Sequence, residues 1–303
     1  MPLFSINNSS LSPISRKKIK LEKDIQVLVE KNLETIFGLT FVAHEFQLNN
    51  FRIDTLAYDK ESKAFVIIEY KRDQSFSVID QGYAYLGLML NNKAEFILEY
   101  NEQNKENLVR TSVDWSQSQV IFVASSFTQH QQASINFKDL PIELWEVKQY
   151  ENDLIDFSQI KPASTSESIQ TVTKDASVKK IAKEVKTYTV DGLFKDDWNN
   201  SKQLYETLVE RVQGLFEPEI SAVKHYIKIY NNSDRVFEIV PQKQGLKLSL
   251  PMNIKQFKDP EKKLRDVSNM GRWTNGETEY QLNDDSDIDY TLFLIKQVVA
   301  KAE

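Results

Sequence analysis

The sequence contains no cysteine among its 303 residues. This absence excludes disulfide bonds, cysteine-ligated zinc sites and catalysis by a thiol, and it is typical of a protein in the reducing cytoplasm. Histidine is also scarce. His44, His130 and His225 lie far apart, and none has a partner at the spacing of a known histidine metal motif. We therefore expect neither a histidine metal site nor a catalytic triad.

Long hydrophobic runs are missing as well. No stretch approaches the roughly 18 apolar residues of a membrane-spanning helix, and the N-terminus has its basic residues after a polar stretch, unlike a secretory signal. Glycine-rich phosphate-binding motifs are absent too, which argues against a nucleotide-hydrolysing motor in this chain. The sequence predicts a cytoplasmic protein that does not engage a membrane.

An excess of basic charge is also lacking. The net charge is −6, and residues 1–160 carry 16 basic and 22 acidic side chains. A protein that held nucleic acid by neutralising many phosphates would show the opposite balance. Any contact with nucleic acid is therefore expected to be local, transient or metal-assisted, with a homodimer or an accessory protein as a further possible partner.

Hydrophobic spacing predicts an α/β domain over residues 1–160. Helical spacing extends over 20–38 and ends at Gly38. Three runs rich in β-branched and aromatic residues follow, and they predict an antiparallel meander of three strands at 41–48, 51–59 and 64–71. The expected elements after it are a helix at 76–90, strands at 95–99 and 119–125, a short helix at 127–137 and a strand at 141–148.

Composition then predicts a linker and a second domain. Residues 161–195 are rich in Ser, Thr, Lys and Val and poor in large apolar residues, which favours a solvated linker. Residues 196–303 predict a small α+β domain, in which two terminal helices cover one sheet. The expected helices lie at 201–216 and 289–302, with strands at 223–230, 235–241, 246–250 and 277–282 between them.

Two carboxylates are set into strands that otherwise favour burial. Side chains alternate along a strand, so Glu69 and Lys71 share a face, and Asp54 interrupts an apolar run on the preceding strand. A short turn could bring Asp54 beside Glu69, where the two charges would repel unless a cation lay between them. Magnesium accepts such oxygen ligands, and a nearby ammonium can orient a metal-bound water. The pattern predicts metal-assisted hydrolysis of a phosphodiester, with a Glu-Lys surface pair as the structural alternative.

This order of elements resembles the core of the PD-(D/E)XK nuclease superfamily. The matching residues are Asp54, Glu69 and Lys71, and the first half-motif here is R-I-D without its proline. The resemblance covers roughly residues 20–150 and implies a restriction-endonuclease-like mixed sheet flanked by helices. It also implies Mg²⁺ or Mn²⁺ as the cofactor and nucleic acid, DNA rather than RNA, as the substrate.

Two further positions resemble the RecB-like branch of that superfamily. The helix after E-x-K there carries a glutamine and then a tyrosine, and D-Q-G-Y-A-Y supplies Gln81 and Tyr85. An acid on the first helix completes the metal site in that branch. Glu22 lies at the start of the apolar stripe and is our expected ligand, with Glu30 and Glu34 as rivals.

The resemblance thus implies that Asp54, Glu69 and Glu22 bind metal, Lys71 positions or activates water, and Gln81 steadies the substrate or the lysine. The alternative is a nuclease-fold protein that has lost activity and binds nucleic acid or protein. Beyond residue 196, R-D-V-S, G-R-W and an acidic run before the last helix resemble a C-terminal domain of a family of unknown function.

Overall fold

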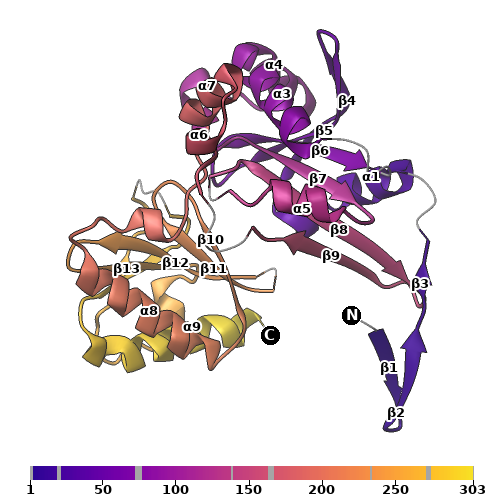
Figure 1. Ribbon diagram of the computed structural model, residues 1–303. Helices are drawn as coiled ribbons and strands as arrows, with labels where there is room; N and C mark the ends of the chain where they lie inside the picture. The colour runs from indigo at the N-terminus through magenta and orange to yellow at the C-terminus, as the bar shows by residue number, and fades with distance from the viewer. Residues whose placement is uncertain are drawn as a thin grey trace. The chain divides into compact units, whose positions relative to one another are not determined.

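A computed structural model describes residues 3–18, 22–71, 77–137, 139–162, 167–232, 234–270 and 274–302. The chain divides into two compact units, Met1–Thr187 and Tyr188–Glu303. Figure 1 labels their helices and strands. The G-R-W motif of the second unit, at 271–273, lies outside the described residues.

A seven-stranded mixed sheet forms the centre of unit 1. Strands β4 to β6 make the expected antiparallel meander, and β6, β7 and β8 run parallel to one another. The order is β3-β8-β7-β6-β5-β4, and β9 also pairs with β8. Their bounds are β3 (Arg16–Lys17), β4 (Thr40–Leu48), β5 (Phe51–Asp59), β6 (Ala64–Lys71), β7 (Gln119–Ala124), β8 (Ile142–Tyr150) and β9 (Ile155–Ile160).

Helices cover both faces of this sheet, which confirms the predicted mixed sheet flanked by helices. One face packs against α1 (Glu22–Lys31) and α2 (Leu33–Phe37), where Ile25, Val29 and Leu33 meet apolar residues of β6. The other face packs against α3 (Val78–Asn91) and α4 (Lys93–Asn104). The smaller elements of unit 1 are β1 (Leu3–Asn7) and β2 (Ser10–Ile14), which form a separate hairpin, η1 (Arg110–Ser112), η2 (Trp115–Gln117) and α5 (Gln129–Ser134).

The prediction of a strand at 95–99 is wrong, because these residues lie inside α4. Phe96, Ile97 and Tyr100 are buried on one side of that helix. A run of five residues is too short to show whether its apolar positions repeat with the period of a helix or of a strand. The flanking sequence, rich in helix-forming residues, decides the outcome here.

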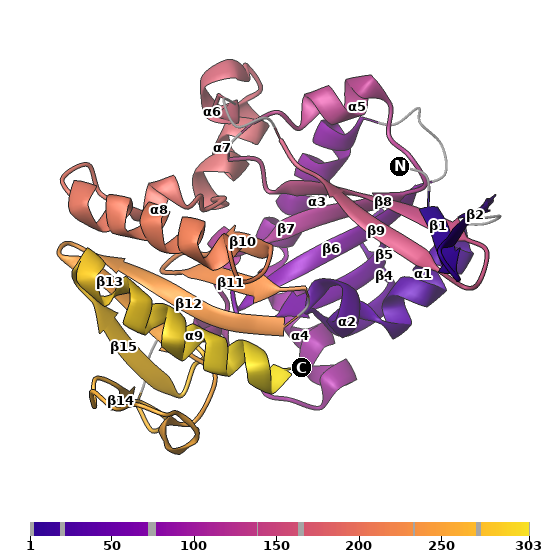
Figure 2. The same cartoon turned by 90° about the horizontal axis from the view of Figure 1, so that it is seen from below.

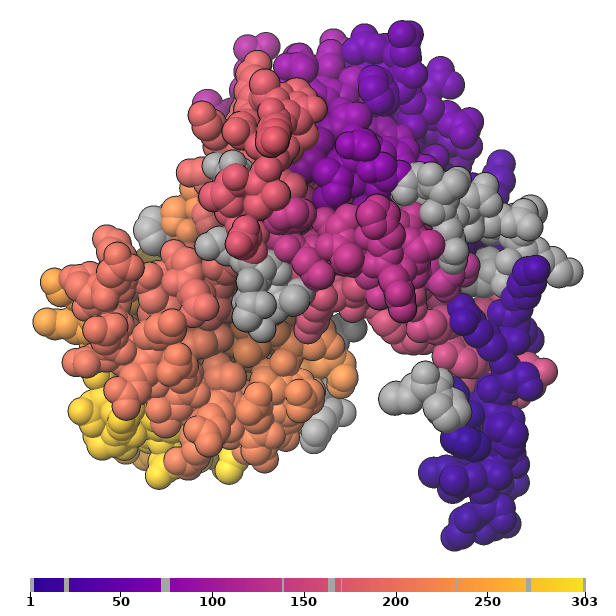
Figure 3. Space-filling view, in the orientation of Figure 1, coloured from indigo at the N-terminus to yellow at the C-terminus, as the bar shows by residue number. Residues whose placement is uncertain are grey.

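Part of the segment 161–195, which we expected to be a linker, is packed. Most of its described residues are exposed, but Ile169, Val178, Ala182 and Val185 belong to the core of unit 1. The segment contains α6 (Ile169–Val172) and α7 (Ala176–Glu184). Val178 and Ala182 lie one turn apart on α7 and Val185 directly follows the helix, and all three side chains are buried in the core of unit 1. Helix α7 packs against α3, and Figure 3 shows red atoms of this part of the chain beside purple atoms of earlier residues of unit 1. Because these apolar residues are small, they are inconspicuous in composition.

Unit 2 is a small α+β fold, as predicted. A six-stranded antiparallel sheet has the order β10-β11-β12-β13-β15-β14. Figure 2 shows α8 (Asn199–Gln213) and α9 (Ile288–Ala302) side by side along it, and their apolar residues share one core with the strands. The remaining bounds are η3 (Asp191–Leu193), β10 (Pro218–Ala222), β11 (Ile227–Asn231), β12 (Asp234–Gln242), β13 (Gly245–Leu250), η4 (Ile254–Gln256), β14 (Arg265–Asp266), β15 (Thr278–Leu282) and η5 (Asp285–Asp287).

Across the described part of the chain, none of the helices combines the length and apolar character that crossing a bilayer requires.

Candidate active site

The ladder between β5 and β6 brings Asp54 and Glu69 together. Thr55 pairs with Ile68, and continuing this register by one residue places Asp54 opposite Glu69. Two hydrogen bonds join the pair: the Asp54 amide donates to Glu69 Oε1 at 3.1 Å, and the Tyr70 amide donates to Asp54 Oδ2 at 3.1 Å. The approach of the two acids that the strand pattern predicts is therefore present in the structure.

Lys71 lies against the same carboxylate. Its Nζ atom donates to Glu69 Oε2 at 3.1 Å. The Glu69 side chain is 2% exposed and that of Lys71 is 21% exposed, so the lysine forms the outer part of the pair. Phe65 and Ile67, on the same face of β6, are buried in the core that also holds α3. The strand thus passes from an apolar core to a charged cluster at its carboxyl end.

Burial makes the charge on Glu69 costly. Desolvation first, and then the nearby charge of Asp54, raise the pKa of Glu69 to about 7, although Lys71 and the Asp54 amide act in the opposite direction. A buried acid with a raised pKa and a specific charged partner is a common feature of functional sites. Added positive charge beside this pair would relieve the repulsion between the two carboxylates.

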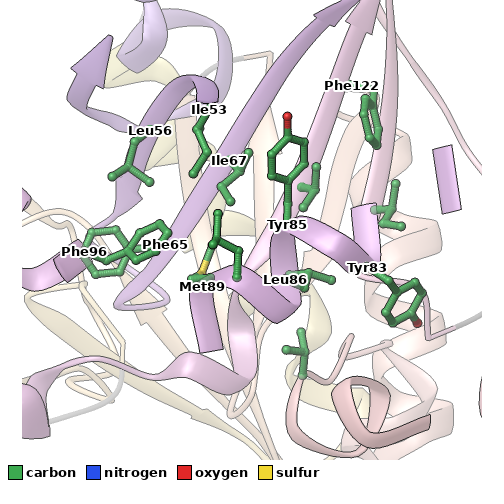
Figure 4. Packing of buried hydrophobic residues seen from close by; sticks show 14 of the residues in the cluster. Ile53, Leu56, Phe65, Ile67, Tyr83, Tyr85, Leu86, Met89, Phe96 and Phe122 are labelled. Carbon is green, nitrogen blue, oxygen red and sulfur yellow. The ribbon is translucent and has the colours of Figure 1, made fainter. Parts of the chain in front are cut away.

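Helix α3 contributes Gln81 and Tyr85 to the cluster. Gln81 Nε2 donates to the Tyr85 hydroxyl at 3.4 Å, and that hydroxyl donates to the Arg52 carbonyl at 3.4 Å. Burial raises the pKa of Tyr85, and the charge of Glu69 raises it further. Figure 4 shows the Tyr85 hydroxyl directed away from the apolar packing around Leu86. Gln81 therefore approaches the carboxylates through Tyr85.

The acids of the first helix are placed differently from our expectation. Glu22 is exposed at the first residue of α1. The Glu30 carboxylate is instead 13% exposed and lies against β5, where Thr55 Oγ1 donates to its Oε1 atom at 2.6 Å. Among the described residues, no group of three or more His, Asp or Glu side chains is arranged to hold a metal ion. The role of Glu22 as a third ligand stays a prediction.

A polar network under β5 and β6 was missed by the sequence analysis. Gln26, 7% exposed, donates from Nε2 to the Asp54 carbonyl at 2.9 Å and to Glu30 Oε1 at 3.0 Å. His44 Nδ1 lies 2.9 Å from that same Glu30 oxygen. Because Gln26 bonds directly to the backbone of Asp54, the network fixes the strand that carries the first acid. The available signal was a glutamine placed on the apolar stripe of α1.

Comparison with known proteins gives one relative over the full length. The chain is 41% identical over 301 residues to an uncharacterized protein of Haemophilus influenzae, and the match covers 99% of each sequence. Residues 190–297 match a domain family described as a domain of unknown function (DUF5655). This match confirms the expected C-terminal domain of a family of unknown function.

Three solved structures match part of this chain at low similarity. A repair endonuclease from Pyrococcus abyssi is 17% identical, with a TM-score of 0.22 over 39% of this chain and 43% of its own. An EndoMS-dsDNA complex is 18% identical, with a TM-score of 0.21 over 37% and 40%. Pyrococcus furiosus SfsA in complex with Ca²⁺ is 11% identical, with a TM-score of 0.23 over 49% and 75%. All three TM-scores lie below 0.5.

Proposed function

This chain belongs to the same family as the Haemophilus influenzae relative, and we propose that its first unit is a metal-dependent nuclease that hydrolyses phosphodiester bonds in nucleic acid. The observation that carries the proposal is the pairing of the half-buried Asp54 with the buried Glu69, to which Lys71 is bonded. The preference for DNA over RNA rests on the resemblance of this motif to the PD-(D/E)XK nucleases.

The two carboxylates suit a hard divalent cation. Magnesium is commonly held by one or two carboxylates, and substrate phosphate and water complete its shell. Asp54 and Glu69 would hold the ion, and their repulsion, part of what raises the pKa of Glu69, is the feature that a cation would relieve. When bound, Mg²⁺ or Mn²⁺ would supply Lewis-acid activation of water and of the phosphoryl oxygens.

The chain's own residues would then orient the reactants. Lys71, partly exposed beside Glu69, would position the attacking water or stabilise negative charge that develops on the phosphate. Gln81 would steady the substrate or the lysine, supported by its bond to Tyr85. Gln26 would keep Asp54 in place from the opposite side of the strand.

Replacing the lysine tests the assignment. We expect purified protein to nick or degrade DNA with Mg²⁺ or Mn²⁺, and Lys71→Ala to lower the cleavage rate by roughly 100-fold or more, since positioned acid-base and electrostatic groups contribute factors of that size. Lys60→Ala is the matched control, because Lys60 is an exposed lysine at the other end of the same strand pair. Cleavage by Lys71→Ala at the rate of Lys60→Ala would contradict the assignment.

A second candidate is a nuclease-fold protein that binds nucleic acid or another protein without cleaving. The observation that favours it is the absence, among the described residues, of a third acid grouped with Asp54 and Glu69. Calorimetry separates the two candidates. A catalytic site should bind Mn²⁺ and lose that binding in Asp54→Asn, whereas wild-type protein that binds DNA without metal would favour the second candidate.

A further inference from the structure

The carboxyl ends of three parallel strands meet beside Lys71. In the register of β6, β7 and β8, Lys71 lies opposite Ala124, and Ala124 lies opposite Glu146. Neighbouring strands are about 4.8 Å apart. Residues that follow Ala124 are therefore the nearest chain to Lys71 on that side, at the edge where parallel sheets commonly bind ligands.

The short strand β3 brings an arginine to this edge. Arg16 pairs with Tyr150 near the end of β8, and its Nη2 atom donates to the Ser125 carbonyl at 2.9 Å. Because Ser125 directly follows Ala124, the guanidinium lies at the end of β7, one strand away from the end of β6. A residue 55 positions before Lys71 in the sequence thus reaches the same edge of the sheet.

The alternation of side chains along β3 and β8 places Arg16 on the face of the sheet that carries the candidate site. Directly paired residues point to the same side, so Arg16 shares a face with Tyr150 and, by alternation, with Lys148 and Leu144. Leu144 is buried in the core that holds α3, which is also the core beneath Glu69 and Lys71. Arg16 and the two acids therefore lie on one face.

The guanidinium of Arg16 donates to an uncharged group, the Ser125 carbonyl. Lys148 has Glu146 at 2.8 Å and Lys71 has Glu69 at 3.1 Å, so both lysines have a carboxylate partner. Arg16 is exposed, and among the described residues no carboxylate forms an ion pair with it. A guanidinium has five donors in a planar fork that matches phosphate oxygens, and only one of them is used in the bond to Ser125.

We propose that Arg16 contacts a backbone phosphate of the same nucleic acid strand that occupies the Asp54–Glu69 site. The inference rests on the proposed function and adds a substrate contact to it. Since the chain is acidic overall, binding must rely on a few local cations. Arg16 is such a cation, and it is held in place by β3 and by its bond to Ser125.

Salt-dependent DNA binding tests this contact. The full chain carrying Lys71→Ala is titrated with a fluorescent DNA duplex in Mg²⁺ at several salt concentrations. Adding Arg16→Ala should weaken binding about tenfold and lower the slope of log affinity against log salt by about one, because one phosphate contact is lost. Arg16→Lys should keep most of the slope, and an unchanged melting temperature of all variants shows that they fold.

Arg110→Ala is the matched control. Arg110 is also exposed in unit 1, but it lies four residues before Asp114, whose amide bonds to Lys63 at the opposite end of β6. The inference would be overturned if Arg16→Ala and Arg110→Ala gave equal slopes of log affinity against log salt. It would also be overturned if the Lys71→Ala protein without a further substitution did not bind DNA. Cleavage retained in Lys71→Ala would instead remove the nuclease assignment, and the comparison of the two arginine variants would still decide the role of Arg16.

Discussion

Glu69 is a carboxylate in a position that burial makes unfavourable for charge. Its side chain has almost no exposure, and it accepts from one backbone amide and one ammonium group. An apolar residue at this point of β6 would avoid the desolvation cost. A buried carboxylate at this position lowers the stability of the folded protein. Strongly perturbed pKa values of this kind are common at functional sites.

This cost predicts a pH dependence of stability. The pKa of Glu69 is raised in the folded protein from 4.5 to about 7, so the folded state binds the proton more tightly than the unfolded state. The resulting stabilisation is complete below about pH 4.5 and is lost as the pH rises through about 7. Wild type should therefore lose roughly 2–3 kcal/mol relative to Glu69→Gln between about pH 5 and about pH 8.

Chemical denaturation in a metal chelator at each pH measures this difference. Glu102→Gln, on the exposed side of α4, serves as the control and should keep a constant difference from wild type. If the Glu69→Gln curve ran parallel to wild type as well, the carboxyl of Glu69 would have an ordinary pKa in the folded protein.

For single residues, the sequence predicted part of the geometry of the candidate site. Alternation in a strand is strict, so the common face of Glu69 and Lys71, and the insertion of Asp54 into the neighbouring strand, follow from the pattern. The first helix was harder to interpret. Angular position favoured Glu22, whereas the contact of Glu30 with Thr55 depends on how α1 lies across β5, which no local pattern specifies.

Helix α3 connects the core of unit 1 to the candidate site, and a glycine sets how closely it can approach the sheet. A Cβ atom on Gly82 would lie 2.4 Å from Ile142 Cδ1 and 2.9 Å from its Cγ1 atom. Because Gln81 and Tyr85 extend from the same helix, this close approach also determines how near they come to Glu69. The position of α3 is therefore a matter of both packing and site geometry.

Two glycine substitutions in α3 should differ in their effect on stability. Gly82→Ala should destabilise by about 1–3 kcal/mol through overpacking against Ile142. Gly87→Ala meets only Ile181 Cδ1 at 3.2 Å, and it should be neutral or stabilising by up to about 1 kcal/mol, since alanine favours a helix. Thermal denaturation of both variants measures this. Equal stability of the two variants would show that α3 adjusts freely against the sheet.

Element types were predictable where the apolar pattern was long. The meander and the parallel strands β7 and β8 follow from β-branched runs with clear turn signals. The helix α4 was mistaken for a strand because its apolar core of three residues fits either period. The helix α7 was missed because Val178 and Ala182 are small, so its burial depends on the nearby α3 rather than on its own hydrophobicity.

For the whole molecule, family membership shows that the two units belong together. The Haemophilus influenzae relative aligns over nearly the full length, so the two units occur together in the family. Unit 2 matches a domain of unknown function over most of its length. With a net charge of −6, the proposed nuclease would have to rely on a bound cation and on few contacts, of which Arg16 is the one we propose.

The most direct test of the central claim is the location of a bound metal ion. Crystals of the full chain soaked in Mn²⁺ can be measured at the manganese absorption edge, which identifies the ion. We predict one ion coordinated by carboxylate oxygens of both Asp54 and Glu69, and its loss in Asp54→Asn. An ion that contacts neither residue, or a site without manganese at saturating concentration, would contradict the account.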